Sequence, residues 1–258
     1  MQTITYLGDC FNKGKLSRWD TSVMPLKVFI GKFNWYQSKG NIQDEYKYTQ
    51  MIIDAFNTWE TLSGGIISFE RVMNLNDSYI NVDWRRVDRK SLGNCTFNFD
   101  KLGRYYTAEL SIGLSDGILH HQYMDENEVF HTILHEIGHS IGLGHSKTKG
   151  DIMYVPHEYG VVNISKNDIA TLKWLYKLPV GKSEAEILSM YSKYNPKSID
   201  DLARKLSGEK SDFEKTKDSL LHKNIAGKDL LEENQNIGDL KKYLLQINNI
   251  KVNFKPKK

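Results

Sequence analysis

One short stretch of the chain, residues 131–146, reads HTILHEIGHSIGLGHS and concentrates side chains that bind metal ions. On a helix, His135 and His139 lie four residues apart, so both imidazole rings project from one face, one turn from each other. That spacing lets two nitrogens meet one zinc ion at about 2.0–2.1 Å. If the chain turns back after the helix, His145 becomes a third ligand and one coordination position stays open. Three neutral imidazoles and an open position are typical of a catalytic zinc site.

Glu136 follows the first of these histidines and lies roughly 100° further round the helix, near the ion but not competing for it. Gly142 permits the sharp turn that ends the helix. A water at the open position would have its pKa lowered toward about 7 by the ion. Glu136 can take the proton of this water as a general base and later pass it to a leaving amine. The pattern therefore predicts hydrolysis of peptide or amide bonds.

The remaining histidines of interest have simpler interpretations. His131 lies one turn before the first predicted ligand, but the histidine after the glycine turn is the better third ligand. His120 and His121 are adjacent, so their side chains diverge. His157 is expected at the surface or at the edge of a cleft. We expect none of the four to bind the metal.

Composition limits the classes of protein that the chain can represent. Its 258 residues are 40% hydrophobic and 11% aromatic, which is enough for a real core. No apolar run approaches the roughly 18–20 residues of a membrane-spanning helix. The net charge is +3, with 16 basic and 12 acidic side chains in residues 181–258, a bias too mild for a nucleic-acid binder. We therefore expect no nucleic acid and no transmembrane segment. The predicted hydrolysis of peptide bonds implies a polypeptide substrate, and we expect a monomer.

Hydrophobic periodicity predicts alternating strands and helices in the first 180 residues. We expect strands at 25–30, 66–72, 77–84, 95–99 and 106–114, and helices at 42–62, at 127–142 and from 165 on. The last of these helices begins with a capping box, Ser165 to Asp168. After Pro179 the chain is rich in Lys, Glu, Asp and Asn with helical apolar spacing, so we expect short helices there. The predicted domains are an N-terminal segment (1–18), a catalytic domain (19–180) and a helical C-terminal extension (181–258).

The motif also resembles that of a known family. The pattern HExxHxxGxxH at 135–145 is followed by Ser146 and then by Met153, eight residues after the third histidine. This resembles the metzincins, zinc peptidases with a methionine turn, and the short interval is similar to that of the matrixins, the matrix-metalloproteinase type. RW before MPLKVFI, AFNTWETLSGGIISFERV, and ISKNDIATLKWLYKLP are similar to further matrixin segments. The likeness covers roughly residues 18–178 and points to a bacterial member.

The resemblance implies a fold and a reaction. The fold would be α+β, with a twisted mixed β-sheet and three main helices, plus the helical appendage. The protein would be a secreted or cell-surface endopeptidase, with Met153 as an apolar floor beneath the zinc. Extended substrate would pair with an edge strand near Gly93–Phe99. Pro156 and Tyr159 would bound the pocket for the side chain after the cut bond, with an apolar preference expected, although Val155 interrupts the family's Met-Tyr-Pro.

Two features depart from the family pattern. No histidine- and aspartate-rich loop lies between Arg85 and Glu126, so we predict one zinc and leave calcium open. Cys10 and Asp9 precede the catalytic domain and could act as a latency ligand, although the family's switch motif is missing. Cys10 could instead pair with Cys95 if the protein is secreted, or both thiols could stay free. All three alternatives remain open at this point.

Two rival functions compete with the peptidase. A latent or non-catalytic zinc module could bind peptide without cutting it, although the presence of Glu136 argues against this. Alternatively, the helical tail at 181–258 could be the functional part and bind a partner or a surface. The natural substrate and the trigger of activation do not follow from the sequence.

Overall fold

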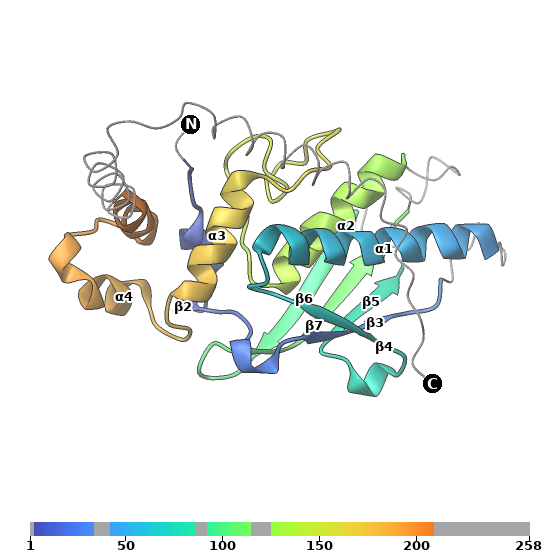
Figure 1. Cartoon of the computed structure of the whole chain (residues 1–258), viewed down its shortest axis with the longest axis horizontal. Coiled ribbons are helices and arrows are strands. Elements are labelled where there is room, and N and C mark those ends of the chain that lie inside the picture. Colours follow the sequence, from blue (N-terminus) through green and yellow to red (C-terminus); the bar gives the residue numbers. More distant parts are fainter. Residues whose placement is uncertain (1–2, 34–41, 86–91, 115–124, 209–258) are drawn as a thin grey trace, which may run out of the picture. The chain divides into compact units, whose positions relative to one another are not determined.

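A mixed β-sheet organises the computed structural model, which describes residues 3–33, 42–85, 92–114 and 125–208 (Figure 1). The five strands are β3 (Leu26–Ile30), β4 (Phe69–Val72), β5 (Ile80–Trp84), β6 (Gly93–Phe99) and β7 (Tyr105–Ile112). Their order is β4-β3-β5-β7-β6. Strand β3 pairs in parallel with β4 and β5, and β5 pairs in parallel with β7. Only β6, at one edge, is antiparallel to its neighbour β7. The fold is thus α+β with a mixed sheet, as predicted.

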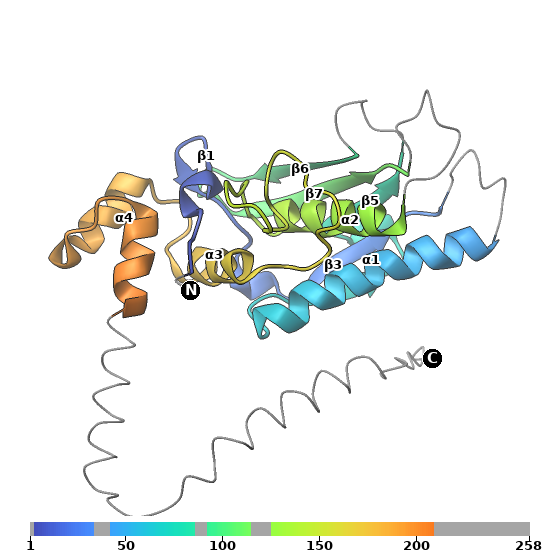
Figure 2. The same ribbon diagram turned by 90° about the horizontal axis from the view of Figure 1, so that it is seen from above.

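Alternating apolar side chains explain why these segments form strands. In β5, Ile80, Val82 and Trp84 are buried, while the residues between them are partly exposed. Side chains two residues apart lie on one face of a strand, so this pattern buries one face of the sheet. The helices α1 (Ile42–Ser63) and α2 (Glu126–Ser140) lie side by side on the same side of the sheet (Figures 1 and 2). The core lies between these helices and the strands.

Specific contacts hold α1 and α2 together and end α2. Trp59 of α1 is fully buried, and its indole Nε1 donates a hydrogen bond to the Leu134 carbonyl at 3.0 Å. At the N-terminus of α2, the Asp125 side chain accepts from the backbone N–H of Asn127. After α2 the chain turns at Gly142, whose φ is +103°, a value that favours glycine. The predicted glycine turn after the motif helix is confirmed.

Helix α3 (Lys166–Lys177) begins with the predicted capping box, in which Ser165 and Asp168 satisfy each other's backbone N–H groups. Beyond it lie α4 (Glu184–Met190) and a further helical stretch at 199–208. Ile187, Ile199 and Leu202 of this region are fully buried in the main core. Short helices after residue 180 are therefore confirmed as far as the described residues reach. The predicted domain boundary at 180/181 stays a prediction, and residues 209–258 of the predicted extension lie outside the described residues.

The N-terminal segment is built into the fold. It consists of η1 (Leu7–Cys10), β1 (Phe11–Asn12) and β2 (Lys15–Leu16), and it lies against α3 (Figure 2). Leu7, Cys10 and Leu16 are at most 1% exposed. The Tyr6 hydroxyl donates to the Asp168 carboxylate at 2.7 Å. Burial of these side chains makes the segment part of the core of the described residues.

Single-turn 3₁₀ helices complete the described elements: η2 (Thr21–Val23), η3 (Leu75–Asp77) and η4 (Ser192–Tyr194). Among the helices in the described ranges, none is long and apolar enough to span a membrane.

Candidate metal centre

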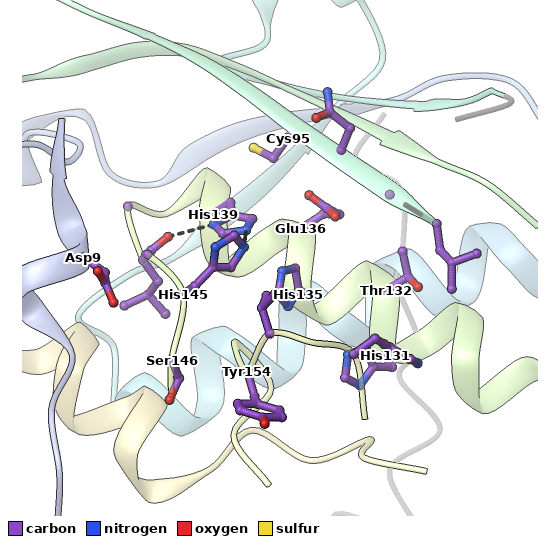
Figure 3. Close-up of a pocket in the computed structure, with 18 of the residues that line it drawn as sticks. Asp9, Cys95, His131, Thr132, His135, Glu136, His139, His145, Ser146 and Tyr154 are labelled. Atoms are coloured by element: carbon purple, nitrogen blue, oxygen red, sulfur yellow. Dashed lines mark hydrogen bonds between the residues drawn. The ribbon is translucent and has the colours of Figure 1, made fainter. Parts of the chain in front are cut away.

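Three histidine side chains, from α2 and from the turn that follows it, lie close together (Figure 3). One nitrogen from each of His135, His139 and His145 lies within 4.8 Å of the others. The Nε2 atoms of His139 and His145 are 3.1 Å apart. Helical spacing places the first two on one face, and the turn at Gly142 returns the chain so that the third reaches them. The three predicted ligands are therefore brought together.

Hydrogen bonds set the tautomers of the first two histidines. Nδ1 of His135 donates to the Ile152 carbonyl at 2.8 Å, and Nδ1 of His139 donates to the Leu143 carbonyl at 2.9 Å. A carbonyl oxygen can only accept, so the proton lies on Nδ1 and Nε2 keeps its lone pair. Such outer hydrogen bonds are typical of metal-binding histidines.

Burial keeps the imidazoles neutral. It lowers the pKa of His135 to about 3 and that of His139 to about 4. Burial also lowers the pKa of His145, while the nearby Asp9 carboxylate acts in the opposite direction. Neutral imidazole is the form that binds a metal ion. Three imidazole nitrogens suit zinc, whereas calcium prefers oxygen ligands. The residues present therefore fit a zinc ion.

Glu136 lies in the same cleft with an unusual environment. Its side chain is buried, 6% exposed, and its Oε2 has no hydrogen-bond partner among the described residues. Burial raises the pKa of this carboxyl to about 8. A carboxyl whose pKa is raised into the neutral range can exchange protons at working pH, which is what a general acid–base needs.

The edge strand β6 approaches Glu136 closely, and a glycine makes this possible. A Cβ added at Gly93 would lie 2.6 Å from Glu136 Oε1 and 2.7 Å from Thr132 Cγ2. Real Cβ atoms do not come this close to such neighbours, so any side chain at position 93 would displace the carboxyl. The sequence analysis placed Gly93 in the substrate-pairing edge strand but did not predict its contact with Glu136, because that contact depends on packing between distant elements.

Met153 lies in a turn directly beside α2. It is fully buried, and its Sδ would be only 2.3 Å from a Cβ added at Gly138. The turn is held by a hydrogen bond from Ser146 N to the Met153 carbonyl at 2.7 Å. The preceding Ile152 accepts from His135 and donates its own N–H to the Asp168 carboxylate at 2.9 Å. The methionine turn thus connects a metal-ligand histidine to the start of α3.

A cleft extends from the three histidines along β6, and its walls only partly match the sequence analysis. Tyr159 lines it, together with Val155 and His157, whereas Pro156 is exposed and does not line it. His131, which we did not expect at the metal, belongs to the wall. The sequence could have shown that His131 lines the cleft, because it lies one turn before His135 on nearly the same helix face.

The loop that carries Tyr159 is tied to α2. The Glu128 carboxylate pairs with His157 Nε2 and also accepts from Gly160 N, the latter at 3.0 Å. Nδ1 of His131 donates to the Val161 carbonyl at 2.6 Å, and the rings of His131 and His157 meet edge to face. Two imidazoles therefore form part of this wall, and the apolar preference expected from the sequence stays a prediction.

The two cysteines do not form a disulfide in this structure, because both thiols are free. Cys10 is buried, and its Sγ contacts the Tyr6 carbonyl at 3.8 Å. Burial raises the pKa of this thiol to about 12, and its Sγ is not among the ligand atoms that converge with the three histidines. The role of Cys10 as a latency ligand stays a prediction. Cys95 lines the cleft from β6, and burial raises its pKa as well. Asp9 lines the cleft beside His145 (Figure 3) but is not among the three residues whose ligand atoms converge.

A mixed sheet with an antiparallel edge strand, a helix carrying HExxH, a third histidine after a glycine turn and a methionine turn define a metzincin-type catalytic domain. The matrixin (peptidase M10) family model matches residues 32–177, more than half of the chain. The chain belongs to the matrixin family.

Curated relatives are distant and mostly longer. A protein of Heliothis virescens ascovirus 3e, named as a matrix metalloproteinase, is 25% identical over 170 residues, which are 55% of this chain and 34% of that protein. Matrix metalloproteinase 095L of Invertebrate iridescent virus 3 is 33% identical over 73 residues, 28% of this chain and 18% of that protein. Astacin-like metalloprotease toxin 5 of Loxosceles gaucho is 27% identical over 150 residues, 57% of this chain and 69% of the toxin. The chain thus spans about a third or less of the two viral relatives. A bacterial source stays a prediction.

Proposed function

We propose that the chain is a zinc-dependent endopeptidase that hydrolyses peptide bonds in extended polypeptide. The observation that carries the proposal is the juxtaposition in one cleft of three neutral imidazoles and the buried Glu136 carboxyl, whose Oε2 has no hydrogen-bond partner among the described residues. Membership of the matrixin family supports the same class of reaction. His135, His139 and His145 would hold one zinc ion.

The proposed chemistry assigns the proton transfers to Glu136. A zinc ion held by the histidines would polarise the substrate carbonyl and make a water molecule more acidic. The Glu136 carboxylate takes a proton from this water as the water attacks the carbonyl carbon. The same carboxyl then returns the proton to the leaving nitrogen, which completes cleavage of the C–N bond. The buried setting of Glu136 favours both directions of transfer, because it brings the pKa of the carboxyl close to neutral.

The sheet edge favours an extended substrate. Strand β6 is paired on one side with β7 and is the last strand in the sheet order, so its other edge faces away from the sheet. Cleft-lining residues of β6 include Gly93, Asn94 and Cys95. A peptide in extended conformation could add to this edge by backbone hydrogen bonds. We therefore propose unfolded or loop segments of proteins as substrates; export and a monomeric state stay predictions.

Cleavage of an unfolded protein tests the proposal. Wild-type protein with one zinc per chain should cleave it, and a zinc chelator should abolish cleavage. Glu136→Gln should keep the zinc and lose activity by about 10²-fold or more, the usual contribution of a general acid–base. Glu70→Gln on the exposed surface of β4 is the matched control and should behave as wild type. Full activity of Glu136→Gln would refute the mechanism, and zinc binding without any wild-type cleavage would favour the peptide-binding module.

A further inference from the structure

The wall of the cleft that contains Tyr159 is a loop without a buried core of its own. Val155, His157 and Tyr159 of this wall loop (residues 155–161) line the cleft. None of the loop residues is buried, and Tyr159 is 82% exposed. A segment with few buried contacts has low local stability, so its hydrogen bonds decide how firmly it is held. The position of this wall therefore depends on its polar anchors.

One carboxylate on α2 supplies two of these anchors. Glu128 lies in the first turn of the helix and is 9% exposed. Its Oε2 pairs with Nε2 of His157, and its Oε1 accepts from Gly160 N at 3.0 Å. Hydrogen bonds to a charged acceptor are among the stronger ones in proteins. Both oxygens of this buried carboxylate thus bind the wall loop.

His131, one turn further along α2, supplies a third anchor. Its Nδ1 donates to the Val161 carbonyl at 2.6 Å. Its ring meets the His157 ring edge to face, with the centroids 4.3 Å apart. The His157 ring in turn meets the Tyr159 ring edge to face at 5.1 Å. A row of contacts therefore runs from Glu128 through His157 to the tyrosine ring at the cleft.

The same face of α2 carries these anchors and the first metal ligand. Glu128, His131 and His135 are three and four residues apart, the spacing of side chains that follow one another along one helix face. The rings of the two histidines lie 6.1 Å apart along α2 (Figure 3). A further side-chain hydrogen bond to the loop, from Gly150 N to Glu158 Oε2 at 2.8 Å, does not involve this helix. The helix therefore sets the distance between the wall loop and the metal position.

We propose that Glu128 is a positioning residue for substrate selection: it holds the wall loop at the distance from the zinc ligands that decides which side chain fits next to the cut bond. Glu128 is neither among the residues that line the cleft nor among the converging ligands, so it acts through the loop. We assign this wall to the side chain that follows the cut bond, as expected from the sequence. The inference rests on the peptidase function proposed above.

Cleavage of two peptide series by the zinc-loaded full chain tests this role. One series varies the residue directly after the cut bond (alanine, leucine, phenylalanine or arginine), and the other varies the residue directly before it. Wild type should discriminate within the first series, because pocket contacts distinguish side chains. Glu128→Gln places an NH₂ group against one of the two donors. The ratio of kcat/KM between the best and the worst peptide should fall about 10-fold in the first series, mainly through KM, and stay unchanged in the second.

Two further variants complete the experiment. Glu126→Gln changes an exposed carboxylate in the same helix turn, paired with Lys47 at 3.0 Å, and is the matched control that should select as wild type does. His157→Phe keeps an aromatic ring in the wall but removes the nitrogen that Glu128 binds, so it should also lower discrimination after the cut bond. Zinc affinity should be equal in wild type and all three variants, measured by competition with a chromophoric chelator.

Each outcome decides between explanations. Unchanged discrimination by folded Glu128→Gln, or by His157→Phe where the former does not fold, would overturn the inference alone, as would a wild type that does not discriminate after the cut bond. Equal losses before and after the cut bond would overturn it in favour of a general loosening of the domain. Weaker zinc binding by Glu128→Gln would overturn it in favour of a role at the metal. Zinc binding without cleavage by wild type would overturn the proposed function and, with it, this inference.

Discussion

Gly138 packs closely against Met153. We therefore expect the substitution Gly138→Ala to lower the unfolding free energy of the wild type but to raise it in a variant that lacks the Met153 sulfur. Gly138 lies in the middle of the HExxH helix, and an added Cβ would be 2.3 Å from Met153 Sδ, 3.1 Å from Met153 Cε and 3.3 Å from Trp59 Cζ2. Ordinary contacts between such atoms are roughly 3.5–4.0 Å. The sulfur would therefore have to move by roughly 1.2 Å or more. Both Met153 and Trp59 are fully buried, so neither has free space to move into.

Two opposing energies determine the outcome of Gly138→Ala. Alanine stabilises a helix interior by about 1 kcal/mol relative to glycine. Overpacking a core costs about 1–3 kcal/mol. The variant should therefore lose up to about 2 kcal/mol of unfolding free energy. In a Met153→Ala background, which itself costs about 2–5 kcal/mol, the sulfur clash disappears and only the tight 3.3 Å contact with Trp59 Cζ2 remains. There Gly138→Ala should be stabilising by up to about 1 kcal/mol.

A double-mutant cycle in urea, with metal removed by chelator, measures this coupling. The expected coupling energy is about 1–3 kcal/mol between Gly138→Ala and Met153→Ala. Gly208→Ala is the control for helix propensity, because its added Cβ would meet nothing within 4 Å. Additive effects in the cycle would refute the reasoning, as would a single Gly138→Ala variant more stable than wild type. Either result would mean that the methionine turn does not pack against the helix as described.

Two further predictions concern buried titratable groups. Tyr6→Phe removes the 2.7 Å hydrogen bond to the buried Asp168 carboxylate and should cost about 1–3 kcal/mol of unfolding free energy in urea; an unchanged midpoint would contradict it. In metal-free protein, burial lowers the pKa of His135 to about 3 and of His139 to about 4 from 6.5, and raises that of Glu136 from 4.5 to about 8. Just below pH 6.5 the unfolded chain binds more protons, because its two histidines are protonated while the folded chain holds one proton on Glu136. Above pH 6.5 the unfolded histidines lose their protons and the folded chain binds more, through Glu136. These groups should therefore make stability greatest near pH 6.5. Glu136→Gln should remove the decline between pH 6.5 and 8 and steepen the rise between pH 5 and 6.5, because the Glu136 proton no longer offsets one of the two histidine protons. Urea unfolding at pH 5, 6.5 and 8 measures both changes, and an unchanged alkaline decline would contradict this.

Local sequence patterns were sufficient for most elements of the catalytic domain. The predicted strand at 25–30 is β3 (Leu26–Ile30), and the predicted helix at 127–142 is α2 (Glu126–Ser140). Periods of two and 3.6 residues and the turn residues are properties of neighbours in the chain, so they can be read without tertiary structure. The strand expected at 66–72 begins later, at Phe69, because residues before it form a bend after α1.

The metal-binding pattern was also local. His135 and His139 share a helix face because of helical geometry, and the turn at Gly142 returns the chain within three residues to His145. Each of these relations spans ten residues or fewer. Short-range backbone geometry therefore determined the convergence of the three imidazoles in advance.

Tertiary packing decided the features that join distant parts of the chain. Asp9 and His145, 136 positions apart in the chain, line the same cleft, and His131 and His157 belong to its wall. No local pattern encodes such contacts, because they depend on how the sheet, the helices and the N-terminal segment pack. The same packing buries Glu136 and so raises its pKa, which residue type alone could not predict. The sequence by itself determined which residues can bind the metal; the fold decided which neighbours support them and how their protons are held.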